Sequence, residues 1–230
     1  MKEKPLTINE LRIMQPFNTL AEKDLQYLFN ATDVVYIHEG EKIFSSDENA
    51  NAVYIVTAGS VRLIQSDGQG HELIVRIASK GDFLGYTTLF PKKIYHITAV
   101  AIKDCRLLRI SKKTALQLIK ISADISIYSI REIAQQLTIA RYNCMSLTHK
   151  QVRGRMAYTL LLLKREHSIG PDGFINVELS RDDIGKLSNM TTANAIRTLK
   201  ELQQDKLIEV NDRHIKILDE DALRHISTIG

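Results

Sequence analysis

The sequence predicts an α+β protein made of three consecutive parts. Short alternating strands occupy residues 34 to 110, an apolar repeat of helical period lies between residues 130 and 147, and short helices followed by a hairpin occupy the remainder. Of the 230 residues 44% are hydrophobic and 25% are charged, which is enough for two modest cores. We therefore expect one domain over residues 1–111, a long helix over 112–149 and a second domain over 150–230.

The first part is expected to begin with short helices between residues 9 and 30, with Thr19 as the N-cap of the helix in LAEKDLQYLF. The runs AVYIV, GSVRLIQ, ELIVRIA and ITAVAI then follow, separated by the turn sequences DGQG and KGD. Several short strands at nearly regular spacing are typical of an antiparallel sandwich or barrel. We predict that this part is an antiparallel sandwich or barrel.

The middle part carries apolar residues at intervals of three and four. These seam residues are Ile130, Ile133, Leu137, Ala140, Cys144 and Leu147. The stripe is narrow and its surroundings are polar, which suits another helix better than a broad globular core. We predict one long dimerisation helix that pairs with its copy in a homodimer. The alternative is a long helix that packs only on its own sheet.

The third part contains LSRDDIGKLSNMTTANAIRTLKEL. Ser180 is expected to cap a first helix, with Asp183 at the capping-box position, and Thr191 to cap a second helix after a turn at Asn189 and Met190. Gly185 leaves room for the close approach of the second helix. The following KLIEVNDRHIKIL predicts two strands around a tight turn, so this part is a winged helix-turn-helix.

The second helix has two chemically different faces. Ala195, Leu199 and Leu202 are expected to face inward, with Ile196 at their flank. The residues left on the outer face are Thr192, Ala193, Asn194, Arg197 and Lys200. A polar and basic outer face favours DNA, whereas a helix that docks on a protein should carry apolar anchors there.

Charge and cysteine content add broad limits. The net charge is +4, and because residues 1–111 carry equal numbers of basic and acidic side chains, the excess lies in the second half. The two cysteines are far apart and no secretory signal precedes them, which predicts a reducing cytoplasm. No apolar run approaches the roughly 20 residues that span a bilayer, so no membrane partner is expected.

The order of these parts resembles the Crp/Fnr superfamily of bacterial transcription regulators. The similarity is carried by VYIVTAGSVRLI and KGDFLGYTTLF in the strand region, by GRMAYTLLLL, and by the helix-turn-helix segment from Leu179 to Val210. For the strand region the resemblance implies an antiparallel, jelly-roll-like β-roll. The resemblance implies a non-enzymatic regulator that binds inverted-repeat operators as a homodimer, with RNA polymerase as a further partner. The runner-up is a ligand-binding domain whose helical tail docks on a protein.

The resemblance also implies where an effector would bind. The corresponding positions here are Gly85, Tyr86, Thr87, Ile97, Thr98, Gln136, Ala140 and Arg141. Cyclic-nucleotide-binding members have Glu after the glycine and Arg-Ser before Ala99, and this chain has Tyr86 and Ile97-Thr98 instead. A buried phosphate without a cationic partner is costly, so cyclic AMP is not expected as the effector. Lys92, Lys93 and His96 are possible replacement charges, although a solvated loop is the simpler interpretation.

Other cofactors leave weaker signals. Two cysteines are too few for the four thiolates of an iron–sulfur cluster, no metal-ligand spacing occurs, and no nucleophile-plus-base pair suggests catalysis. Haem stays open, because seven histidines are present without paired spacing. The sequence specifies neither the effector nor the regulated genes.

DNA contacts are expected from several residues of the helix-turn-helix. Arg197 matches the family's later arginine and is suited to guanine, and the alternative is that it pairs only with a phosphate. By their chemistry, Thr192 and Asn194 can reach adenine or a thymine methyl. The expected positioning contacts to phosphates come from Ser180, Thr191, Arg213 and His214, with Lys200 further along the outer face.

Overall fold

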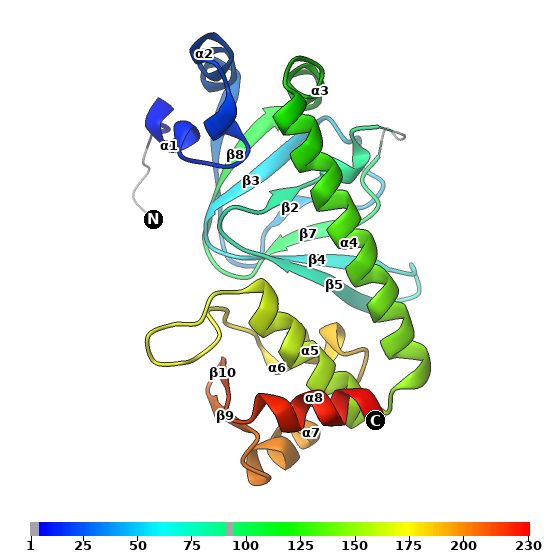
Figure 1. Cartoon of the computed structure of the whole chain (residues 1–230). Helices are drawn as coiled ribbons and strands as arrows, with labels where there is room; N and C mark the ends of the chain where they lie inside the picture. Colours follow the sequence, from blue (N-terminus) through cyan, green and yellow to red (C-terminus); the bar gives the residue numbers. More distant parts are fainter. Residues whose placement is uncertain (1–4, 91–93) are drawn as a thin grey trace. The chain divides into compact units, whose positions relative to one another are not determined.

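The computed structural model describes residues 5–90 and 94–230 (Figure 1). The chain forms two compact units, one of residues 1–65 with 76–137 and the other of residues 66–75 with 138–230. The long helix α4 (Ala123–His149) contributes to both units, so the division falls within it and not at its ends. The apolar repeat between residues 130 and 147 lies within this single helix, as predicted. The expected helix over 112–149 is nevertheless wrong in extent, because Ser122 is extended and separates a first helix, Lys112–Ile121, from α4.

The first unit begins with α1 (Ile8–Arg12), the 3-10 helix η1 (Phe17–Thr19) and α2 (Glu22–Asn30). The expectation that Thr19 caps α2 is wrong. Thr19 is the last residue of η1, where its hydroxyl donates to the Pro16 carbonyl at 2.9 Å, and the N-cap position of α2 is Ala21, which makes no side-chain cap. The Thr19 hydroxyl, which the sequence predicted as the cap of α2, therefore bonds within its own turn instead.

The roll consists of two four-stranded sheets with the orders β1-β8-β3-β6 and β2-β7-β4-β5. Its strands are β1 (Thr32–Ile37), β2 (Lys42–Phe44), β3 (Ala52–Ala58), β4 (Val61–Ser66), β5 (Glu72–Ala78), β6 (Phe83–Leu84), β7 (Thr98–Ala101) and β8 (Cys105–Ser111). The β1–β8, β3–β8 and β4–β7 pairs are antiparallel, as the alternating pattern predicted.

Two helices follow the roll. Ser111 caps α3 (Lys112–Ile121) by accepting the Thr114 N–H, and α4 then places Ile125 in the core. That core joins β3 and β8 to the N-terminal helices through residues such as Leu25, Val53 and Leu108. Burial of these side chains fixes the first turns of α4 against the sheet, because each contributes about 1.5–3 kcal/mol of transfer free energy.

The second unit contains the helices α5 (Val152–Glu166), α6 (Arg181–Leu187), α7 (Thr192–Gln204) and α8 (Glu220–Ile229). A hairpin of β9 (Ile208–Asn211) and β10 (His214–Ile217) lies between α7 and α8, so the predicted wing is confirmed. The helix α8 was not predicted, although Asp219 caps it in the ordinary way by accepting the Ala222 N–H at 2.9 Å. Met156, Leu160, Ile184 and Leu202 are fully buried and form the centre of this unit.

Within the described ranges, no helix is both long enough and apolar enough to cross a membrane.

Candidate functional site

The turn between α6 and α7 is built by local hydrogen bonds. The Ser180 hydroxyl accepts the Asp183 N–H at 3.0 Å, and the Asp183 carboxylate accepts the Ser180 N–H at 3.2 Å in return. Thr191 caps α7 by accepting the Asn194 N–H at 3.2 Å. Both predicted caps are therefore confirmed, and each requires only residues three apart in the sequence.

Gly185 makes the turn possible. A Cβ atom at this position would lie 2.9 Å from the Met190 carbonyl oxygen, and the start of α7 at Thr192 is 3.5 Å from it. The backbone of the turn thus passes against the side of α6 where any other residue would carry a side chain. Asn189 adopts a positive φ of 48°, a conformation that asparagine tolerates better than most residues.

The two faces of α7 agree largely with the sequence prediction. Ala195, Leu199 and Leu202 are buried, whereas Ala193, Arg197 and Lys200 are exposed and Thr192 and Asn194 are half-buried. Ile196 differs from the prediction that it flanks the inner face, because half of its side chain is exposed (50%). The inner position goes to Thr198, which is 2% exposed.

Several candidate side chains on α7 are held by intramolecular contacts. The Thr192 hydroxyl donates to Asp182 of α6 at 3.0 Å. Arg197 donates to Asn194 Oδ1 at 3.1 Å and lies 3.9 Å from the Glu201 carboxylate. These exposed contacts are weak, so Arg197 can exchange them for a base at little cost.

The remaining DNA candidates surround α7. Arg213 is exposed in the turn of the wing hairpin, and its carbonyl accepts the Leu179 N–H at 3.1 Å, which ties the wing to the segment before α6. His214 is half-buried, lies 3.8 Å from the Glu178 carboxylate and packs edge-on against Phe174. The Ser180 hydroxyl is engaged in its capping box, with the Asp183 carboxylate 2.6 Å away.

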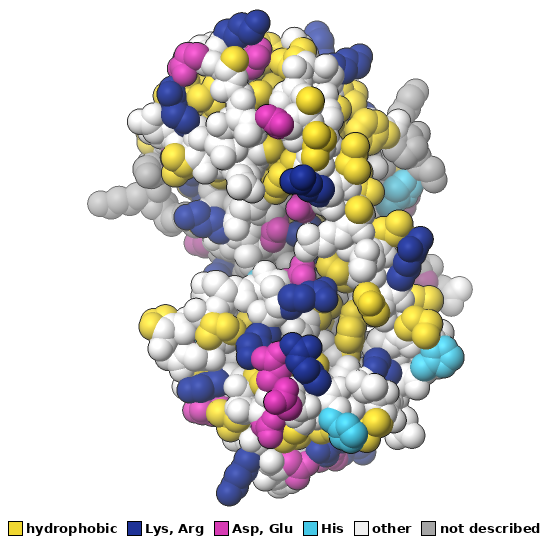
Figure 2. All heavy atoms as spheres, viewed as in Figure 1, with side chains coloured by type: hydrophobic (Ala, Val, Ile, Leu, Met, Phe, Trp, Pro, Cys, Tyr) yellow, Lys and Arg dark blue, Asp and Glu magenta, His cyan; other side chains and the backbone are white. Residues whose placement is uncertain are grey.

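The seam residues of α4 form an exposed apolar stripe. Ile130 is 65% exposed, Leu137 is 50% exposed and Ile133 is 38% exposed, while Ala140 and Cys144 are also exposed. Figure 2 shows hydrophobic side chains along the course that α4 takes in Figure 1. Leu147 is half-buried and lines a small cavity with Leu73 and Tyr158. The exposed part of the stripe therefore ends before Leu147.

The expected effector positions begin at Gly85, where the roll interior is filled by Tyr95. Tyr95 is 2% exposed, stacks on Phe44 with ring centroids 4.0 Å apart, and donates its hydroxyl to the Ala52 carbonyl at 2.7 Å. A Cβ atom on Gly85 would lie 3.0 Å from the Tyr95 ring. Burial raises the pKa of Tyr95 to about 12, so this side chain is neutral and offers no charge to a phosphate.

The other effector candidates differ in exposure and in the contacts they make. Thr87 is exposed, Ile97 is half-buried, and the hydroxyl of Thr98 accepts the Ser46 N–H at 3.1 Å. Ala140 and Arg141 are exposed and belong to the second unit. Gln136 is half-buried, and its Nε2 has no hydrogen-bond partner within the described ranges. Lys92 and Lys93 lie outside the described residues, and His96 is exposed.

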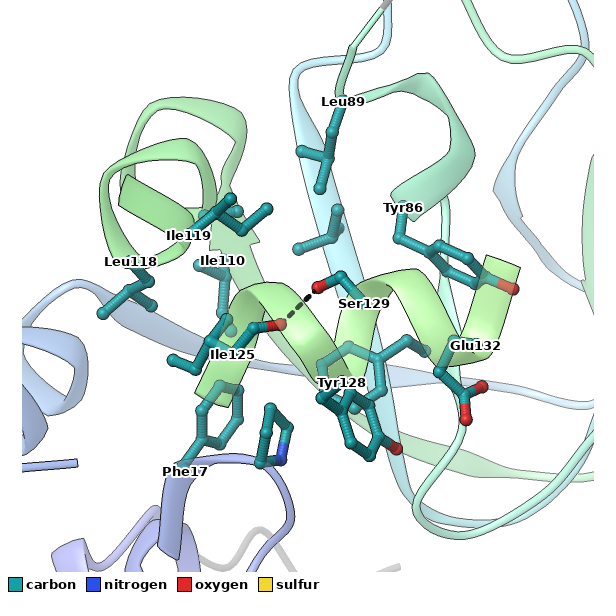
Figure 3. Close-up of a pocket in the computed structure, with 14 residues that line it drawn as sticks. Phe17, Tyr86, Leu89, Ile110, Leu118, Ile119, Ile125, Tyr128, Ser129 and Glu132 are labelled. Atoms are coloured by element: carbon teal, nitrogen blue, oxygen red, sulfur yellow. Dashed lines mark hydrogen bonds between the residues drawn. The ribbon is translucent and has the colours of Figure 1, made fainter. Parts of the chain in front are cut away.

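Tyr86 lines a different space, an apolar cavity of about 50 Å³ between the roll, α3 and α4 (Figure 3). Aromatic and aliphatic side chains surround it, including Phe17, Leu118 and Ile125, and Ser129 and Glu132 of α4 add polar atoms. Burial raises the pKa of Tyr86 and raises that of Tyr128 to about 12, so both phenols stay protonated at neutral pH. No sequence pattern indicated this cavity, because residues from distant segments line it.

Comparisons with known proteins agree with this architecture. Residues 34–122 match the cyclic nucleotide-binding domain family, and residues 154–226 match the Crp-like helix-turn-helix domain family. The cAMP-activated global transcriptional regulator CRP of Salmonella typhimurium is 30% identical over 184 residues, which cover 79% of this chain and 84% of the relative. The nitrogen fixation regulation protein FixK of Azorhizobium caulinodans is 25% identical, over 86% of this chain and 79% of the relative.

Solved structures show the same fold. FixK2 from Bradyrhizobium japonicum superposes with a TM-score of 0.78 at 22% identity, covering 86% of this chain and 98% of its own. The c-di-GMP responsive global regulator CLP of Xanthomonas campestris gives a TM-score of 0.71 at 22% identity, with 86% and 99% coverage. With its roll, long helix and winged helix-turn-helix in this order, the chain belongs to the Crp/Fnr superfamily, whose members are DNA-binding transcription regulators and not enzymes.

Proposed function

We propose that this regulator acts in the cytoplasm as a homodimer on inverted-repeat operators, with RNA polymerase as a further partner. The observation that carries the proposal is the exposed outer face of α7, which the Thr191 cap and the Gly185 turn present at the surface of the second unit. The exposed stripe on α4 supports the dimer, since it leaves Ile130 and Leu137 without apolar cover in one chain.

Dimer symmetry determines the shape of the expected target. A two-fold dimer presents two α7 helices to successive major grooves, about 34 Å apart along the DNA axis. Selection from a pool of random duplexes should therefore enrich sites that contain an inverted repeat. Enrichment of sites without such symmetry would contradict the proposed mode of binding.

Arg197 is expected to contact a base. Its guanidinium can donate two hydrogen bonds to guanine O6 and N7 once it leaves Asn194. Replacement of Arg197 by Ala should cost about 1–3 kcal/mol of binding free energy and relax the preference at one symmetric base pair. Titrations against the selected operator and its single-base variants measure both effects.

Arg213→Ala is the matched control, because Arg213 lies in the wing turn and is expected to contact phosphate. This variant should lower the affinity for all DNA sequences alike and reduce the salt slope of binding by about one. If Arg197→Ala leaves affinity and base preference unchanged, α7 does not contact bases as proposed.

We also propose that any effector binds the apolar cavity beside α4. Ile125, Tyr128 and Ser129 of α4 face this cavity, and the seam residues Ile130 and Ile133 belong to the same turns of the helix. The cavity is smaller than the roughly 150 Å³ that hold a benzene ring, so a larger apolar group would displace α4 and alter the seam. Its described lining is largely apolar and its volume is far too small for a haem, which favours a small uncharged apolar effector.

Cyclic AMP is not expected to bind with useful affinity. Tyr86 and Ile97-Thr98 replace the ribose and phosphate contacts of cyclic-nucleotide binders, and the Tyr95 ring packs against Gly85. Calorimetry with cyclic AMP should show no saturable heat at micromolar concentrations, and operator affinity should not change. Saturable micromolar binding together with tighter operator binding would overturn this expectation.

A further inference from the structure

Ile196 gives the outer face of α7 an apolar patch. Its side chain is 50% exposed, and Ala193, one turn before it, is exposed as well. Residues three and four apart are neighbours on a helix surface, so Thr192 and Ala193 lie on one side of Ile196 and Lys200 on the other. The patch is thus continuous with the basic side chains of the same face.

Helix geometry places Ile196 well within this face. At 100° per residue, the buried residues Ala195, Thr198, Leu199 and Leu202 define an inward direction. Ala193, Arg197 and Lys200 lie nearly opposite to it. Ile196 lies closer to that outward direction than Thr192 or Asn194 does, although the sequence predicted the latter two, which are polar, as the DNA contacts.

The chemistry of the neighbouring groups narrows what this patch can recognise. The Thr192 hydroxyl already donates to Asp182 at 3.0 Å, so its proton is directed away from a base. An isoleucine side chain offers no hydrogen bond and can add binding energy only by covering apolar surface. In the major groove the apolar group on a base edge is the C5-methyl of thymine.

We propose that Ile196, with Ala193 beside it, contacts the C5-methyl group of a thymine in each half-site and so determines specificity. This inference rests on the proposed entry of α7 into the major groove. Burial of one methyl group corresponds to about a fourfold gain in affinity. A symmetric operator engages both subunits, so the two contacts together are worth about fifteenfold.

Substitution of deoxyuridine for thymine tests the contact, because it removes only the C5-methyl group. Each thymine pair of the selected operator is replaced in turn at both symmetric positions, and the affinity of the wild-type protein is measured. One pair of positions should show a loss of about fifteenfold. With Ile196→Ala, the loss of affinity on replacing thymine by deoxyuridine at that pair should fall well below fifteenfold.

Leu218→Ala is the matched control, since Leu218 is also 50% exposed in the same unit but lies outside α7. It should retain the wild-type sensitivity to deoxyuridine. Both variants remove exposed side chains, and their melting temperatures should match that of the wild type.

Two results would overturn the inference while leaving DNA binding by α7 intact. One is a wild-type protein that binds a symmetric operator yet is insensitive to deoxyuridine at every position. The other is an Ile196→Ala protein whose sensitivity equals that of the wild type. Selection that enriches no inverted repeat would instead contradict the proposed function itself.

Discussion

Replacement of Leu137 by Asp is expected to convert the dimer into a monomer. Leu137 lies at the middle of the exposed stripe on α4, with Ile133 and Ile130 on the preceding turns. In a paired seam the substitution would place two carboxylates against each other in apolar surroundings, at a cost of about 3–5 kcal/mol or more. Analytical ultracentrifugation across a concentration series measures the dissociation constant directly.

The control is Gln135→Asp, which adds the same charge to an exposed position about half a helical turn from Leu137. It should leave the dimer intact. Because Leu137 is exposed within one chain, the Leu137→Asp monomer should keep its fold and lose operator affinity through loss of the second half-site contact. A monomeric wild type, or an unchanged dimer after Leu137→Asp, would show that the seam is wrongly assigned.

Substitution of Gly185 by Ala is expected to destabilise the second unit and abolish tight operator binding. The added methyl would lie 2.9 Å from the Met190 carbonyl oxygen, so the backbone of the turn must shift. Overpacking of this kind costs about 1–3 kcal/mol, which outweighs the gain of about 1 kcal/mol that alanine brings within a helix. Thermal unfolding and operator titration measure the two consequences.

A graded comparison separates packing from helix propensity at this position. Gly185→Val carries a larger side chain toward the same carbonyl and should be more destabilising than Gly185→Ala. The unfolding of the Ile196→Ala variant serves as reference, because that change lies on the exposed face of α7 and leaves the turn untouched. A melting temperature for Gly185→Ala above that of the wild type would contradict this prediction, because it would show that the backbone of the turn shifts without loss of stability.

The elements near the proposed DNA interface were predictable because their signals are local. The caps at Ser180 and Thr191 form hydrogen bonds to residues three positions ahead, so the required atoms are specified within one turn of sequence. The seam of α4 repeats at intervals of three and four, and the strands of the roll alternate, so period alone distinguishes them. None of these patterns depends on the residues that pack around it.

The errors arise where a neighbour competes for the same group. Thr19 has a side chain suited to cap α2, but the carbonyl of Pro16 in the preceding turn takes its hydroxyl. Ile196 has the hydrophobicity of an inner residue, but Thr198 and Leu199 occupy the inner positions and leave Ile196 half exposed. Hydrophobicity and capping preference are properties of one residue. Burial, in contrast, depends on which residues the packing of the whole unit places in the interior.

By itself the sequence determined the order of the three parts and the capped helix-turn-helix, and it led to the prediction that Tyr86 and Ile97 do not hold a cyclic nucleotide. Only the tertiary structure decided that Tyr95 fills the roll beside Gly85, and that Tyr86 turns toward a cavity with Phe17 and Tyr128. Phe17, Tyr86 and Tyr128 are far apart along the chain, and no periodic pattern connects any of these residues. Their contacts exist because the folded core brings the segments together, and that information lies in packing and not in any single stretch of sequence.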